Sequence, residues 1–254
     1  MADDQPALDD HQYTVAGLRE YEAIYGRDFV SPGGRAMTAE ILNSIGWADS
    51  RRVLDVGCGL GGAAFMFATD HGADVTAVDA SRNMAVEAAK RATDYELDGQ
   101  VSVVHGDIMT ADVGGQFDVI HSREVFLHIH AKADLFATLS SLLRDGGQLI
   151  FTDYCRGDQP STRGFDSYLS EFGYDLRTVA EIGSLMGAVG LSDISAIDMT
   201  ERFIAIHHDE IAGLPTSGLS EEKQRHMAEG WQAKIDRAEA GEQRWGWFRA
   251  TGSG

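Results

Sequence analysis

The feature that most constrains this 254-residue chain is an apolar run, residues 52–56, that breaks into glycines and then into the helix-forming residues 63–68. A short buried strand, a tight glycine turn and a helix are the parts from which open parallel sheets build a ligand crevice. Glycine lets the backbone approach a ligand where any Cβ would collide. Gly57, Gly59 and Gly62 also satisfy the dinucleotide spacing G-x-G-x-x-G, with Asp79 as the ribose acid, so the spacing alone leaves the ligand open.

The residue two positions before the first glycine separates the possible ligands. Asp55 aims a carboxylate into the expected crevice. A negative charge there repels a pyrophosphate and attracts the ammonium of an amino-acid-like cofactor, so a sulfonium cofactor fits better than a dinucleotide. The stretch resembles the first motif of the class I S-adenosylmethionine-dependent methyltransferases, in which D-x-G-x-G-x-G follows the first strand. That resemblance implies S-adenosyl-L-methionine as the cofactor.

Charge and cysteine content exclude several function classes. The chain carries 40 acidic residues against 21 lysines and arginines, a formal net charge of −19. Such a field repels phosphate backbones and anionic lipid surfaces, so we expect neither a nucleic-acid nor a membrane partner. Cys58 and Cys155 give no disulfide framework, and the sequence has neither a signal-peptide pattern nor a long apolar span. We therefore expect a cytoplasmic protein.

Strand-like and helix-like segments alternate through the rest of the chain. Strand patterns cover 74–79, 101–105, 117–122, 148–154, 194–199 and 245–250. Helical patterns cover 12–25, 35–45, 132–143, 200–211 and 220–240. Two more helices are marked by their caps: Ser81 caps a helix that runs through Thr93, and a capping box at Thr178 opens a helix that runs to Val189. Residues 144–147 have the composition of a turn. This alternation predicts an α/β fold, a Rossmann-like seven-stranded, mostly parallel sheet with helices on both faces.

We expect a single methyltransferase domain over residues 1–254. An N-terminal helical lid (1–46) precedes a core (47–254), and the core carries substrate-side helices at about 156–178 and 200–241.

Two further acids stand where predicted strands end. Asp79 closes the second strand, where a carboxylate can take both hydroxyls of a ribose. Asp107 and Ile108 follow the third strand, and a polar group beside an aliphatic one suits the amine and the face of an adenine. Together with Asp55, these residues predict an adenosyl site at the carboxyl ends of the strands.

From Gln12 onward the chain resembles the phosphoethanolamine N-methyltransferases over nearly its whole length. The motifs that carry the resemblance are Tyr21-Glu22-x-Ile24, Ser31-x-Gly33-Gly34, Ser122-Arg123-Glu124 to Leu127-His128, Thr152-Asp153-Tyr154-Cys155, Gly173-Tyr174-Asp175-Leu176, and Gly230-Trp231 to Arg244-Trp245-Gly246. The resemblance implies that the cofactor is bound by Tyr21, Val30, Ser31, Asp55, Gly57, Gly59, Asp79, Ala80, Asp107, Ile108 and Arg123.

Methyl transfer to nitrogen requires a free lone pair held close to the methyl group, so a protonated amine cannot react. The resemblance implies that Tyr13 and His128 close over the site as catalytic residues. A histidine near neutral pKa can accept a proton or orient the amine. The resemblance also implies that the acceptor is bound by Gln12, Glu124, Tyr154, Tyr168, Phe172, Tyr174 and Lys234. The other histidines lack a cysteine at ligand spacing, so we expect no metal.

The phosphate end departs from the family pattern. The family carries an arginine in a Gln-Arg-Gly-Tyr-like run, whereas this chain has Phe172 in the sequence Glu-Phe-Gly-Tyr. The change removes the bidentate cation that best matches phosphate, and Arg163 or Arg177 could supply it instead. Glu124 replaces the usual aspartate and is longer, which could shift the position of the amine.

The sequence thus predicts an S-adenosylmethionine-dependent N-methyltransferase of a small polar amine, with phosphoethanolamine or its methylated forms as the leading candidates. One alternative keeps the cofactor but methylates the sulfur of a thioether, or a non-phosphorylated amine or amino acid. Two others are an NAD-dependent oxidoreductase built on the same glycine turn and a non-catalytic cofactor-binding module.

Overall fold

The structure is a computed structural model that describes residues 15–46 and 51–253, with side chains from residue 20 onward. The chain packs as two compact units, Met1–Ser122 and Arg123–Gly254. The predicted fold class is confirmed, because the strands form a seven-stranded, mostly parallel sheet with helices packed on it. No helix in the described part of the chain is long and apolar enough to cross a membrane.

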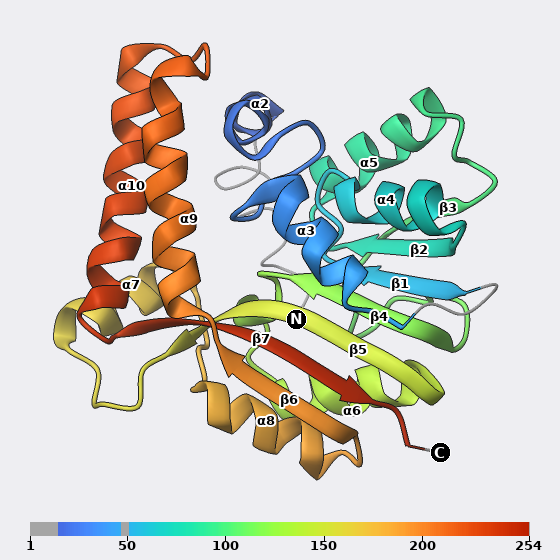
Figure 1. Ribbon diagram of the computed structural model, residues 1–254. Helices are drawn as coiled ribbons and strands as arrows, with labels where there is room; N and C mark the ends of the chain where they lie inside the picture. Colours follow the sequence, from blue (N-terminus) through green and yellow to red (C-terminus); the bar gives the residue numbers. More distant parts are fainter. Residues whose placement is uncertain (1–14, 47–50, 254) are drawn as a thin grey trace. The chain divides into compact units, whose positions relative to one another are not determined.

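Unit 1 contains two N-terminal helices and then an alternation of strands and helices (Figure 1). Its elements are α2 Val15–Tyr25, α3 Gly34–Asn43, β1 Arg52–Val56, α4 Gly62–His71, β2 Asp74–Asp79, α5 Arg82–Asp94, β3 Val101–His105 and β4 Phe117–Arg123, of which only the last residue falls in unit 2. The strand order in this part of the sheet is β3-β2-β1-β4, and the neighbouring strands are parallel. Helix α4 packs on β1 and β2, and α5 packs on β2 and β3.

The start of α5 shows how local sequence fixes these elements. Ser81 lies in extended backbone between β2 and α5, and its Oγ accepts a hydrogen bond from the backbone N–H of Met84 at 3.2 Å. This N-cap satisfies one of the donors that the first turn of a helix leaves unpaired. The predicted cap and both neighbouring elements are confirmed.

Unit 2 contains three strands, a pair of long helices that run side by side, and shorter helices (Figure 1). Its elements are the 3₁₀ helix η2 Phe126–His128, α6 Lys132–Leu142, β5 Leu143–Arg156, α7 Arg163–Phe172, α8 Val179–Ala188, β6 Ser192–Asp198, α9 Thr200–Gly213, η3 Leu214–Thr216, α10 Glu221–Glu239 and β7 Gln243–Thr251. The strand order is β5-β7-β6, and both pairs are antiparallel. The core of the unit is aromatic, with Phe151 of β5 stacked on Phe248 of β7 at 4.7 Å between ring centroids.

One predicted element is wrong. Residues 144–147 were expected to form a turn before the fifth strand, but they are the first part of β5. The Gly146 N–H donates to the Gly252 carbonyl at 3.0 Å, and the Gly252 N–H donates to the Gly147 carbonyl at 2.8 Å. Pairing with the end of the chain therefore satisfies the backbone that a turn would have left to solvent.

Candidate functional site

Backbone hydrogen bonds to β2 fix the glycine turn after β1. The Gly57 N–H donates to the Val78 carbonyl at 2.7 Å. The Asp79 carboxylate spans the turn and the start of α5, since it accepts the N–H of Gly59 at 2.8 Å and the N–H of Ser81 at 2.8 Å. The acid that was predicted to bind a ribose is therefore fixed between the glycine turn and the start of α5.

Close packing explains why the turn is made of glycine. An ideal Cβ built on Gly61 would lie 2.4 Å from the Phe65 ring, and one on Gly62 would lie 2.6 Å from the Asp28 carbonyl oxygen. Gly61 also has φ 94°, a conformation that other residues rarely adopt. These contacts and this backbone conformation require glycine at both positions.

Asp55 is buried at the end of β1 and pairs with a histidine that the sequence analysis did not select. His121 Nδ1 of β4 lies 2.7 Å from Asp55 Oδ1, and both side chains are almost fully buried. The other carboxylate oxygen, Oδ2, is also buried and accepts no hydrogen bond within the described residues. A buried carboxylate oxygen without a donor is costly, and a cationic ligand group would satisfy it.

The remaining residues predicted for the adenosine end differ in burial. Asp107 is exposed, and its Oδ1 accepts the N–H of Met109 at 2.9 Å, while Ile108 is buried beside it. Ala80 is half-buried between Asp79 and the Ser81 cap. The turn after β3 thus places one exposed carboxylate next to one buried aliphatic side chain.

Three predicted cofactor residues lie in or just after α2. Tyr21 stacks on Tyr25 at 6.0 Å between ring centroids, and burial, with the Glu20 charge as a second cause, raises the pKa of the Tyr21 hydroxyl. Val30 packs against Leu60 of the glycine turn. Ser31 is half-buried, and its carbonyl accepts the N–H of Gly34 at the start of α3.

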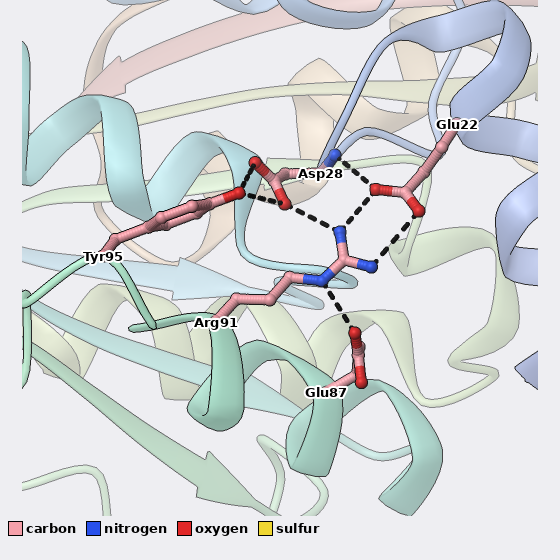
Figure 2. Close-up of polar contacts among 5 residues, drawn as sticks. All are labelled: Glu22, Asp28, Glu87, Arg91 and Tyr95. Atoms are coloured by element: carbon pink, nitrogen blue, oxygen red, sulfur yellow. Dashed lines mark hydrogen bonds and ion pairs between the residues drawn. The ribbon is translucent and has the colours of Figure 1, made fainter. Parts of the chain in front are cut away.

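A cluster of charges fastens α2 and the following loop to α5 (Figure 2). Arg91 of α5 bonds the carboxylates of Glu22, Asp28 and Glu87, at 2.7 Å to Asp28 and 2.9 Å to Glu87. The Tyr95 hydroxyl donates to Asp28 at 2.9 Å. Sequence periodicity could not reveal this cluster, because Glu22 and Arg91 are 69 residues apart. The predicted Gln12 and catalytic Tyr13 lie outside the described residues.

In unit 2, Glu124 is held in an unusual backbone conformation directly after β4. Its φ is 53°, a left-handed conformation that costs a non-glycine residue roughly 1–2 kcal/mol. Glu124 Oε1 accepts the Thr152 hydroxyl at 2.6 Å and the indole N–H of Trp245 at 3.0 Å. Arg123, which was predicted to contact the cofactor, lies beside this carboxylate, with Nη2 3.5 Å from Oε2. Two neutral donors and one guanidinium therefore orient a nearly buried acid.

His128 is the last residue of η2, and a buried lysine fixes this helix and the residue after it. Lys132 Nζ donates to the carbonyls of Phe126 and Ile129, at 2.7 and 2.6 Å, on either side of His128. Burial, followed by the Lys132 charge, lowers the pKa of His128 to about 4. The ring contacts Tyr174 edge-on at 5.2 Å between centroids. The structure therefore presents the predicted histidine as a neutral imidazole.

The rings of Tyr168, Phe172 and Tyr174 pack against one another, and the Tyr174 ring also contacts His128. Phe172 stacks on Tyr174 at 5.5 Å and lies 5.1 Å from the Tyr168 ring, yet 48% of its surface is exposed. Neither of the two arginines that the sequence offered in place of the family's phosphate-binding arginine adds an unpaired cation to these rings. Arg163 is exposed, and Arg177 donates to Asp175 at 3.0 Å.

Tyr154 and Lys234 form a polar contact between β5 and α10. Lys234 Nζ donates to the Tyr154 hydroxyl at 3.2 Å. Burial lowers the pKa of Lys234 to about 8, although the nearby Glu210 and Glu124 charges oppose that shift. Tyr154 is nearly buried and packs edge-on against Phe203. The structure thus brings Tyr154 together with Lys234, and His128 together with Tyr174.

Two supporting residues were in quoted motifs but were given no role. Thr152 and Trp245 both reach Glu124, and the strand register explains how. Trp245 of β7 is directly opposite Tyr154 of β5, and Thr152 is two residues from Tyr154, so all three share one face of the sheet. Period-2 alternation in β5 was the signal that could have selected Thr152. Within residues 15–46 and 51–253, no three His, Cys, Asp or Glu side chains gather as a metal site.

Comparison with known proteins gives consistent results. A family model described as a methyltransferase domain matches residues 53–147. Phosphoethanolamine N-methyltransferase 1 of Zea mays is 34% identical over 259 residues, which cover 97% of this chain and 50% of that protein. The chain spans about half the length of this and the other plant relatives it matches. Phosphoethanolamine N-methyltransferase of Plasmodium falciparum is 30% identical over 258 residues, covering 98% of this chain and 96% of that protein.

A solved structure has the same fold over nearly the whole chain. It is phosphoethanolamine N-methyltransferase 2 of Haemonchus contortus, in complex with phosphomonomethylethanolamine and S-adenosylhomocysteine. The TM-score is 0.92 at 29% sequence identity, and the match covers 98% of this chain and 60% of that one.

Proposed function

The chain belongs to the phosphoethanolamine N-methyltransferase family, and we propose that it transfers methyl groups from S-adenosyl-L-methionine to the nitrogen of phosphoethanolamine or its methylated forms. One observation carries the proposal beyond the family. Unit 2 holds an oriented acid, Glu124, and a cation, Lys234, that neighbouring side chains connect: Trp245 donates to Glu124 and lies opposite Tyr154, whose hydroxyl accepts from Lys234. An acid and a cation in one unit match an acceptor that has an ammonium at one end and a phosphate at the other.

The residues of unit 1 fit the cofactor. The buried Oδ2 of Asp55 lacks a donor among the described residues, and the glycine turn leaves no room for a Cβ. We assign the cofactor site of unit 1 to Tyr21, Val30, Ser31, Asp55, Gly57, Gly59, Asp79, Ala80, Asp107 and Ile108, and Arg123 stays a predicted cofactor residue. When bound, S-adenosylmethionine supplies a methyl group on a positively charged sulfur. We further propose that α2 and α3 form the lid of this site, fastened by Arg91.

The residues of unit 2 hold the acceptor amine and manage its proton. The Glu124 carboxylate, oriented by Thr152 and Trp245, binds the ammonium form. His128 is neutral at pH 7, so its lone pair is available to accept an N–H of the acceptor. A dianionic phosphate bound nearby favours the imidazolium and raises the pKa of His128 toward the range in which it can take that proton. By its motif position, Tyr13 is the second catalytic residue that we propose, and it lies outside the described residues.

Compartment and partners follow from charge. Both cysteines are free and buried, and the formal net charge is −19. We propose that the protein is a cytoplasmic enzyme that acts on a small molecule and binds neither a nucleic acid nor a membrane surface.

Mass spectrometry of reactions with isotope-labelled S-adenosylmethionine tests the proposal. The panel comprises phosphoethanolamine, its monomethyl form, ethanolamine and a thioether amino acid. We expect label on the nitrogen of the two phosphorylated amines. Label on the thioether alone would assign sulfur methylation, and label on ethanolamine alone would assign a non-phosphorylated acceptor. Cofactor binding without label on any compound would indicate a non-catalytic module, and binding of NAD in place of S-adenosylmethionine would indicate an oxidoreductase.

A further inference from the structure

Helix α10 presents two cations on one face in a chain that is dominated by acids. Lys234 and Arg237 are three residues apart, which places them as neighbours on the helix surface. Among the described residues, no carboxylate lies within ion-pair distance of either cation. The chain has 40 acidic residues, so two neighbouring cations without an acidic partner are unexpected in a surface that serves only solubility. The arrangement leaves their positive charge available to an anion.

The guanidinium of Arg237 is held in place on two sides. Its Nε donates to Oε1 of Gln243 at 3.0 Å, and the Gln243 side chain is fully buried in β7. Its Cζ lies 3.9 Å from the centroid of the Tyr168 ring. A guanidinium has five N–H donors, and the bond to Gln243 uses only the one on Nε. The plane of the group is therefore fixed while its outer edge, formed by the two Nη atoms, meets no carboxylate.

The groups around Arg237 suit a phosphate. Lys234 donates to the Tyr154 hydroxyl, and Tyr168 lies under the guanidinium. Burial raises the pKa of Tyr168 and the charge and hydrogen bond of Arg237 only oppose that shift, so its hydroxyl stays a neutral donor at pH 7. Helix α7 contributes Phe172 to the same aromatic group, and its Arg163 is exposed. Arg177, which lies between α7 and α8, is paired with Asp175.

We propose that Arg237 is a specificity-determining residue that binds the phosphate of the acceptor together with Lys234, Tyr154 and Tyr168. This inference rests on the proposed function, because it names the group that recognises the anionic end of the same acceptor. A planar guanidinium matches two phosphate oxygens at once, and a lysine ammonium acts only as a point charge. The phosphate subsite of this chain therefore takes its forked donor from α10 rather than from α7.

Calorimetric titration of phosphoethanolamine into protein saturated with S-adenosylhomocysteine tests the assignment. Arg237→Gln should weaken phosphoethanolamine binding by about 10- to 100-fold, the loss expected for hydrogen bonds to a charged group. Arg237→Lys keeps the charge without the fork and should fall between Arg237→Gln and wild type. The affinity for S-adenosylhomocysteine should not change in either variant. Arg225→Met is the matched control, because Arg225 is exposed on the same helix.

The other possible results of these titrations separate the role of Arg237 from the proposed function. Phosphoethanolamine binding in Arg237→Gln or Arg237→Lys within twofold of wild type would overturn the role of Arg237 and leave the proposed function standing. If wild type does not bind phosphoethanolamine, the proposed function fails, and titration with inorganic phosphate then decides the anion site separately. Phosphate binding in wild type that is lost in Arg237→Gln would support the site, and equal binding or none in both proteins would overturn it.

Discussion

Replacing Arg91 with methionine should destabilise unit 1, because the carboxylates of Glu22 and Asp28 would lose the cation that pairs with them. Arg91 bonds Glu22 of α2 and Asp28 of the following loop, and these three side chains keep exposures of only 12%, 16% and 13%. Removing one member of a buried ion pair costs ~3–5 kcal/mol, because the remaining charge stays buried without a partner. Water reaches part of each group here, so we expect a loss of about 2 kcal/mol in the free energy of unfolding.

The assay is thermal unfolding followed by circular dichroism. For a chain of this length, a loss of that size lowers the midpoint by roughly 4–8 °C. Arg82→Met is the control, since Arg82 is exposed in the first turn of the same helix. A midpoint for Arg91→Met within about 1 °C of wild type would refute the reasoning.

The pH dependence provides a second check on the same variant. Burial raises the pKa of Glu22, but the bonds from Arg91 and from the Asp28 N–H outweigh it, so the pKa lies below its ordinary value. A carboxyl whose folded pKa is lowered contributes stability above its unfolded pKa, about 4.3, and loses it as pH falls through the folded pKa. The gap between wild type and Arg91→Met should therefore narrow below about pH 4, and a gap independent of pH would contradict the assignment.

Two other predictions concern unit 2. The His128 ring should titrate with a midpoint of about 4 by NMR in the absence of ligands, and a midpoint above 6 would contradict its burial. Because its folded pKa is lowered, this group should reduce stability as pH falls from about 6.5 toward 4. Trp245→Phe keeps an aromatic ring but removes the donor to Glu124, so kcat/KM for the acceptor should fall about 10-fold with unchanged affinity for S-adenosylhomocysteine. An unchanged kcat/KM would show that Thr152 alone orients the carboxylate.

Local pattern was sufficient for most elements of the fold. Apolar runs ending at Asp55 and Asp79 identified β1 and β2, and the capping residues Ser81 and Thr178 marked the starts of α5 and α8. These signals depend only on neighbouring residues, so sequence contains them. The segment 144–147 was misread because its glycines are typical of a turn, while its backbone partner, Gly252, lies more than a hundred positions away.

The candidate site was predictable where a residue follows a strand and not where distant elements meet. Asp55, Asp79 and Asp107 were found from their positions at or just after the carboxyl ends of strands. His121, Arg91 and Arg237 were missed, since each acts through a partner that only the tertiary fold brings close. The absence of an arginine at position 172 was visible in the sequence, but the position of Arg237 over Tyr168 was not.

The central claim is that the protein methylates a phosphorylated amine, and a competition reaction tests it most directly. Wild-type protein receives S-adenosylmethionine labelled at its methyl carbon and equal concentrations of phosphoethanolamine and ethanolamine, and carbon NMR reports which amine carries the label. The account predicts a labelled N-methyl group on phosphoethanolamine at least about ten times as abundant as on ethanolamine, because the phosphate contacts add more than about 1.4 kcal/mol. Equal labelling of the two amines, or label on ethanolamine alone, would contradict it.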